Sequence, residues 1–152
     1  MSIFQSLNTS ASALTAQRLR MDVISSNMAN VETTRGKLVN GEWQPYRRKT
    51  VSFKPVDGQF SSMLNRAMGN SKVTAGDGVT VSSIKEDMET PFKLVFDPTH
   101  VDANEDGYVQ MPNVDPLREM IDLMSATRSY EANITVLNAN KSMLMKALEI
   151  GK

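Results

Sequence analysis

Along the N-terminal part of the chain, apolar residues recur every seven positions and polar residues fill most of the places between them. One heptad position holds Leu7, Leu14, Met21 and Met28, and the adjoining position begins with Phe4 and Ala11. This spacing predicts an amphipathic helix from about Ser2 to Val31, roughly 45 Å long at 1.5 Å per residue. Because Ser, Thr, Gln and Asn have modest helix propensities, we expect the helix to gain its stability from a partner.

The C-terminal part repeats the pattern with clearer boundaries. Either Asn113 or Asp115 can cap a helix whose first turn contains Pro116. Glu119 then brings negative charge near the positive end of the helix dipole. Two heptad positions follow, with Met120, Thr127, Ile134, Lys141 and Leu148 on one and Leu123, Tyr130, Leu137 and Leu144 on the other. The pattern predicts a helix from about Pro116 to Ile150, about 50 Å long.

Two long helices with narrow apolar stripes, one at each end of the chain, predict a coiled coil. Polar residues interrupt both stripes: Arg18 and Lys141 occupy core-type positions, and Asn133 and Asn140 lie beside them. Such residues fix register and partner at a cost in stability, which favours the coiled coil. A helical hairpin that closes an ordinary globule remains the alternative.

Between the helices, the period changes from seven to two, which is typical of strands. Four short strands are predicted, at residues 46–55, 79–87, 92–96 and 107–109. The polar, glycine-containing segment 69–78 is predicted to be a mobile loop. The predicted fold class is therefore α+β, with residues 1–34 and 114–152 forming an inner helical domain and residues 35–113 forming a β-rich insertion.

One segment has the opening pattern of a calcium-binding loop. Asp102, Asn104 and Asp106 occupy alternate positions and Gly107 follows, as in the first half of an EF-hand loop. Position 12 of that loop carries a bidentate Glu, but here it is Asn113, which offers one neutral oxygen. We therefore interpret the segment as an acidic turn and expect no metal, with calcium on those three side chains as the alternative.

Composition excludes several classes of function. Seventeen basic residues balance seventeen acidic ones, so no overall charge favours nucleic acid or membrane binding. Arg47, Arg48 and Lys49 are interpreted as a solvated strand face, with phosphate contact as the alternative. His100 is the only histidine and there is no cysteine, so we expect neither an enzyme nor a cofactor. No stretch has the pattern of a secretory signal or a membrane span.

Four segments resemble the flagellar axial proteins, the family of rod, hook and hook–filament junction components. The most similar members are those of the proximal rod. The matching segments are "SSNMANVETT" at 25–34, "PYRRK" at 45–49, "FDPTHVDANEDGYVQMPNVD" at 96–115 and the C-terminal 119–152 with its Tyr-Glu-Ala-Asn core. Residues 53–84 carry no family motif. Where the family continues Asn-Thr-x-Gly-Tyr, this chain reads Thr33-Thr34-Arg35-Gly36-Lys37, without the tyrosine.

The resemblance implies a structural subunit of the bacterial flagellar rod, which transmits motor torque. It implies that terminal helices pack into the inner wall of a tube, that the β unit faces outward, and that the turn at residues 102–109 orients the C-terminal helix. Implied partners are further copies, other rod proteins and the export apparatus, which passes the unfolded chain without a cleavable signal. The implied location is the rod outside the cytoplasmic membrane, within the periplasm where an outer membrane exists.

From the helical pattern and this resemblance together, we expect a set of residues to contact neighbouring subunits. They are Phe4, Leu7, Leu14, Met21, Met28, Asn30, Met120, Tyr130, Asn133, Ile134, Leu137 and Leu144. The alternative function is a free soluble protein, either a calcium-responsive module or a coiled-coil adaptor with cytoplasmic partners.

Overall fold

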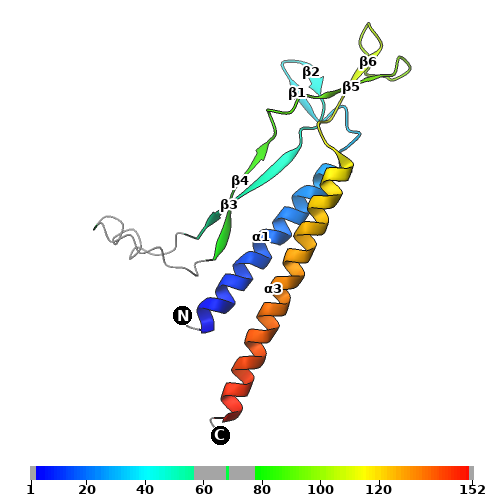
Figure 1. The fold of residues 1–152 in the computed structure, drawn as a ribbon. Coiled ribbons are helices and arrows are strands. Elements are labelled where there is room, and N and C mark those ends of the chain that lie inside the picture. The colour runs from blue at the N-terminus through cyan, green and yellow to red at the C-terminus, as the bar shows by residue number, and fades with distance from the viewer. Residues whose placement is uncertain (1–2, 57–67, 69–77, 151–152) are drawn as a thin grey trace. The chain divides into compact units, whose positions relative to one another are not determined.

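The computed structural model describes residues 3–56, 68 and 78–150. The chain divides into two compact units. Unit 1 contains the described residues of Met1–Leu19, Ser52–Ser83 and Ala126–Lys152, and unit 2 contains Arg20–Val51 and Ile84–Ser125. Both helices and one pair of strands contribute segments to each unit (Figure 1). The predicted mobile loop at residues 69–78 lies outside the described residues, except for Gly78.

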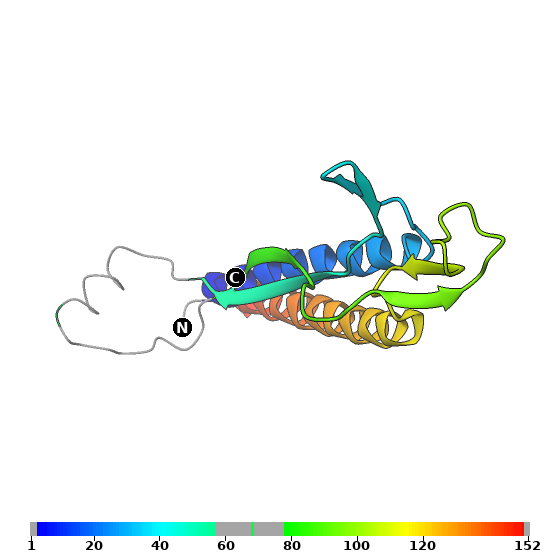
Figure 2. The same cartoon turned by 90° about the horizontal axis from the view of Figure 1, so that it is seen from above.

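The two predicted helices are confirmed as α1 (Ile3–Ala29) and α3 (Pro116–Ile150). Helix α1 ends two residues before the expected Val31, whereas α3 has the expected bounds. Asp115 is the cap of α3, because its Oδ1 accepts a hydrogen bond from the Leu117 N–H at 3.1 Å. Within each unit, a segment of α1 lies beside a segment of α3 (Figure 1 and Figure 2).

In the described part of the chain, six short strands form three separate two-stranded sheets, which confirms the α+β class. The pairs are β1 (Lys37–Val39) with β2 (Glu42–Gln44), β3 (Lys49–Pro55) with β4 (Val79–Glu86), and β5 (Lys93–Phe96) with β6 (Tyr108–Met111). Strands β3 to β6 correspond to the four predicted strands. The antiparallel hairpin of β1 and β2 was not predicted.

The turn of the β1–β2 hairpin has a clear sequence signal, the dipeptide Asn40-Gly41. Both residues have positive φ, 54° and 90°, as a type I′ turn requires. The Gly36 N–H extends the pairing by donating to the Gln44 carbonyl at 2.8 Å. A Cβ at Gly36 would lie 2.7 Å from the backbone nitrogen of Tyr46, so only glycine fits the segment that precedes this hairpin.

Burial along the helices follows the predicted period, but not the predicted heptad position on α3. Glu119, Ala126 and Asn140, which are spaced by multiples of seven residues, are at most 8% exposed. The position predicted from Met120 and Leu148 is wrong by one residue, because these side chains are 47% and 74% exposed. The second predicted position of α3 is half-buried throughout, at Leu123, Tyr130, Leu137 and Leu144.

On α1, the predicted apolar residues Leu7, Leu14, Met21 and Met28 are all half-buried. Three polar residues that bond to α3 each lie one position before a predicted apolar residue: Ser6, Arg20 and Asn27. In unit 1, Asn140 Nδ2 donates to Ser6 Oγ at 2.6 Å. In unit 2, Arg20 pairs with Asp122 and Asn27 bonds to Glu119, so the two segments run antiparallel. The contact between the helices is therefore partly polar in each unit.

Candidate functional site

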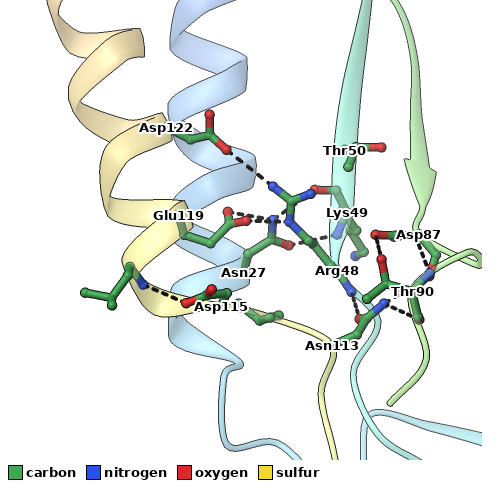
Figure 3. Close-up of polar contacts among 12 residues, drawn as sticks. Asn27, Arg48, Lys49, Thr50, Asp87, Thr90, Asn113, Asp115, Glu119 and Asp122 are labelled. Atoms are coloured by element: carbon green, nitrogen blue, oxygen red, sulfur yellow. Dashed lines mark hydrogen bonds and ion pairs between the residues drawn. The ribbon is translucent and has the colours of Figure 1, made fainter. Parts of the chain in front are cut away.

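A buried polar cluster in unit 2 joins both helices to the strands (Figure 3). We define the Asn27 junction as Asn27, Arg48, Asn113, Glu119 and Asp122. These residues come from α1, from the segment before β3, from the segment before α3, and from α3 itself. Asn27, Asn113 and Glu119 are at most 5% exposed, so their polar atoms depend on protein partners.

Asn27 uses its full hydrogen-bonding capacity. Its Nδ2 donates to the Lys49 carbonyl at 2.9 Å and to Glu119 Oε2 at 3.0 Å. Its Oδ1 accepts from the Lys49 N–H at 2.9 Å and from the Tyr46 hydroxyl at 3.0 Å. An amide is the side chain that supplies two donors and two acceptors at one point. Asn27 thus attaches α1 to the start of β3 and to α3 at the same time.

Glu119 has no exposed surface, and its negative charge is balanced by a guanidinium. Arg48 Nε donates to Glu119 Oε1 at 2.5 Å, and Arg48 Nη2 lies 3.3 Å from Asp122 Oδ2. The Arg48 side chain is only 14% exposed. The interpretation of residues 47–49 as a solvated face is therefore wrong for Arg48, because the buried carboxylate needs a partner of opposite charge.

Asn113 joins the rest of the Asn27 junction to the chain segment that links β4 to β5. Its Oδ1 accepts from the Arg48 N–H at 2.8 Å, and its Nδ2 donates to the carbonyls of Asp87 and Thr90 at 3.1 and 3.0 Å. The Thr90 N–H and hydroxyl bond to the Asp87 carboxylate, which holds the pKa of Asp87 below its ordinary value. Asn113 is thus used for this connection and does not cap α3.

In the acidic turn, the carboxylate of Asp102 is bonded to other residues of the same chain. Arg35 contacts Asp102 Oδ1 through Nε at 2.7 Å and Nη2 at 2.6 Å, and Thr34 donates to Oδ2 at 2.7 Å. These bonds, above all those from Arg35, hold the pKa of Asp102 below its ordinary value. Asn104 Oδ1 accepts the Tyr108 N–H at 2.7 Å. Within the described residues, no group of three or more His, Asp or Glu side chains could hold a metal ion.

The predicted contact residues differ in exposure. Phe4, Met120 and Ile134 are exposed, at 72%, 47% and 36%. The others are half-buried: Leu7, Leu14, Met21, Met28, Asn30, Tyr130, Asn133, Leu137 and Leu144. The amides of Asn30 and Asn133 donate to carbonyls four residues earlier in their own helices, Ser26 and Ser129. The helices carry further exposed apolar side chains that were not predicted, among them Ile121 at 63%, Met143 at 60% and Ile150 at 86%.

Sequence reasoning missed the Asn27 junction because its members are far apart in the chain. Asn27 and Glu119 are separated by 92 residues, and Arg48 and Glu119 by 71. The available signal was the position of Asn27 inside the family-like segment at 25–34. His100 is half-buried, and its Nδ1 accepts the Asp102 N–H at 3.0 Å. Of the helices in the described ranges, none combines the length and hydropathy needed to cross a membrane.

Comparison with known proteins places both helices in flagellar families. Residues 7–36 match the family described as "Flagella basal body rod protein". Residues 105–150 match the family described as "Flagellar basal body rod FlgEFG protein C-terminal". The two matches cover Asn27, Asn113, Glu119 and Asp122, but not Arg48.

Similar proteins cover the chain from end to end. A protein of Bacillus subtilis is 66% identical over 152 residues, which is 100% of each chain. A protein of Borreliella burgdorferi is 43% identical, covering 99% of this chain and 98% of its own, and one of Salmonella typhimurium is 41% identical over 100% of both. Each carries the name "Flagellar basal-body rod protein FlgC". The chain therefore belongs to the FlgC family of flagellar basal-body rod proteins.

Proposed function

We propose that this protein is a structural subunit of the flagellar basal-body rod, not an enzyme, and that its terminal helices form the contacts with neighbouring subunits. The rod assignment rests on the names of full-length relatives. Under this proposal, the partners are other rod components, including further copies of the chain. The calcium-responsive alternative loses its support because Asp102 is already bonded to Arg35 and Thr34.

The observation that carries this proposal is the number of large apolar side chains that the helices leave exposed. Leu117, Met120, Ile121 and Met124 are exposed in the first turns of α3, at 47% or more. Met143, Met145, Leu148 and Ile150 are exposed near its end, at 55% or more. Exposed apolar patches of this kind mark protein contacts, and covering each such side chain contributes about 1.5–3 kcal/mol.

Several finer features belong to the same proposal. The polar contacts of Ser6 with Asn140 and of Asn27 with Glu119 are suited to fixing the register of a coiled coil formed by the two helices. The helices would form an inner helical domain, with residues 35–113 as an outward β-rich insertion. Assembly would follow export of the unfolded chain, outside the cytoplasmic membrane, and the rod would transmit torque through many parallel helix contacts.

The proposal is tested with Met143→Asp in motile cells. Met143 is 60% exposed, so the charge should leave the subunit folded and act on the contact with a neighbour. Leu137 is less suitable because it is half-buried within the subunit. We expect loss of swimming in soft agar and loss of assembled rods in isolated basal bodies, with normal helical circular dichroism of the purified variant.

The matched control is Ser142→Asp, which places the same charge at the adjacent exposed position of α3. We expect this variant to swim. Normal rods in Met143→Asp cells, or a block by Ser142→Asp alone, would overturn the assignment of the α3 contact surface.

A further inference from the structure

The β1–β2 hairpin of unit 2 presents an apolar pair that its own chain leaves uncovered. Leu38 and Trp43 are direct cross-strand partners, so their side chains lie on the same face of the hairpin. Their exposed fractions are 55% and 56%. In Figure 2, the hairpin projects away from the part of α1 that belongs to the same unit. Exposed tryptophans of this kind are the residues that most often dominate a protein contact.

Unit 2 also contains a groove of about 400 Å³, elsewhere on its surface. Val23 of α1 and Ile84 of β4 are the apolar residues of its lining. The polar residues of the lining are two lysines, two carboxylates and a serine: Lys49, Lys85, Asp22, Glu86 and Ser26. Neither Leu38 nor Trp43 lines it. The volume of the groove exceeds the roughly 150 Å³ of an apolar cavity that accepts a benzene molecule, so it is large enough for an indole ring.

The chemistry of the groove suits an aromatic side chain. A lysine ammonium within about 6 Å of a ring is attracted to the electron-rich face of that ring. Lys49 already makes such a contact, because its Nζ lies 5.5 Å from the centre of the Tyr46 ring. Indole is the aromatic ring that binds cations best, and two lysines, Lys49 and Lys85, are in the lining of the groove.

We propose that Trp43 of one copy of this chain inserts into the groove of Val23, Ile84, Lys49 and Lys85 on the next copy. This inference rests on the proposed function, since a rod subunit must contact its neighbours. A projecting apolar residue and a pocket on different parts of one chain make a heterologous contact, which repeats from copy to copy and builds an open helical assembly when the rotation between copies does not close a ring. Such a contact would add a second attachment between copies, outside the terminal helices.

Trp43 is the only tryptophan, so its fluorescence reports directly on this contact. For the purified chain, we expect the emission maximum to move to shorter wavelength as the concentration rises and the indole leaves water. Ile84→Asp should abolish the shift by placing a charge in the groove. Met88→Asp, at a 68% exposed position of unit 2 outside the groove, should retain it.

A mixing experiment separates the two halves of the contact. The Ile84→Asp chain keeps Trp43 but has a blocked groove, and the Trp43→Ala chain has an open groove but no fluorescence. The emission maximum of the Ile84→Asp chain alone should not move with concentration, and the Trp43→Ala chain alone has no tryptophan emission. In the mixture, the emission maximum should move to shorter wavelength as it does for the wild type. An Ile84→Asp chain that shifts alone, or a mixture that does not shift, would overturn the inference.

Cross-linking tests the same contact inside assembled rods. The chain has no cysteine, so the thiols of a Glu42→Cys, Glu86→Cys chain are its only ones, and a disulfide between them on neighbouring copies reports the proposed contact. Oxidation of isolated basal bodies should give a ladder of multimers of this chain, and Glu42→Cys with Met88→Cys should give much less. Assembled rods without a ladder would overturn the inference while leaving the proposed function intact, because that function is tested separately by Met143→Asp.

Discussion

Removing the carboxylate of Glu119 should strongly destabilise unit 2. Glu119 is fully buried and accepts hydrogen bonds from Arg48 at 2.5 Å and from Asn27 at 3.0 Å. Deleting one partner of a buried ion pair costs about 3–5 kcal/mol, because the other charge stays buried without its partner. In the Glu119→Ala chain, Arg48 still has its ion pair with Asp122, at 3.3 Å. We therefore expect the loss of unfolding free energy to lie near the lower end of this range, at about 3 kcal/mol.

The assay is urea unfolding of the purified chain, followed by Trp43 fluorescence and far-ultraviolet circular dichroism. With a urea dependence of about 1–3 kcal/mol per molar, a loss of about 3 kcal/mol lowers the midpoint by roughly 1–3 M. Glu119→Gln should also destabilise, because its NH₂ group must face a donor, either Arg48 Nε–H or Asn27 Nδ2–H. The matched control is Glu131→Ala on the exposed face of α3, where we expect a change within about 0.5 kcal/mol.

A double variant separates the ion pair from the packing around it. Replacing both Arg48 and Glu119 with methionine removes both buried charges, and such replacements are often close to neutral. We therefore expect the double variant to be more stable than Glu119→Ala. A Glu119→Ala chain whose midpoint matches that of the wild type would refute the conclusion that the Asn27 junction holds unit 2 together.

Two further predictions concern the segment after α1 and the acidic turn. Gly36→Ala should lower the free energy of unfolding by about 1–3 kcal/mol, and with it the urea midpoint, because the new Cβ would lie 2.7 and 2.8 Å from the Tyr46 backbone; a wild-type midpoint would contradict this. The pKa of Asp102 is lowered in the folded chain, so its stabilising effect is complete well above the unfolded value of about 3.9 and disappears as pH falls through the lower folded value. Asp102→Asn should therefore lower the urea midpoint at pH 7 and lower it progressively less as the pH falls below about 3.9; a loss that does not shrink with falling pH would contradict this.

Local patterns in the sequence identified most of the secondary structure. The heptad spacing and the cap at Asp115 placed α3 at its observed bounds, because helix propensity, capping and proline preference act within a few residues. The alternating pattern located β3 to β6 for the same reason. The β1–β2 hairpin was missed although Asn40-Gly41 is a strong turn signal, because its strands are only three residues long.

Of the two heptad positions predicted for α3, the one that contains Leu123, Tyr130, Leu137 and Leu144 is half-buried, whereas the other is displaced by one residue. The large apolar residues of α3 predict a stripe through Met120 and Leu148, but Glu119, Ala126 and Asn140 are the buried side chains. The rule that apolar residues lie inside assumes that they are covered by the same chain. A subunit that keeps apolar side chains for its neighbours departs from that rule, and a charge such as Glu119 can be buried when a partner neutralises it.

By itself, the sequence determined the period of each helix, the position of most strands and the family, because these depend on residues close together or on motifs read directly. Only the tertiary structure decided which helix face is buried and which charges are paired. Asn27 can join α1, β3 and α3 only after residues 92 positions apart have come together. From the sequence alone, Arg48 was interpreted as a solvated strand residue, whereas in the structure it is paired with Glu119. The reason is that the free energy of a charge is set by its neighbours in space rather than by its neighbours along the chain.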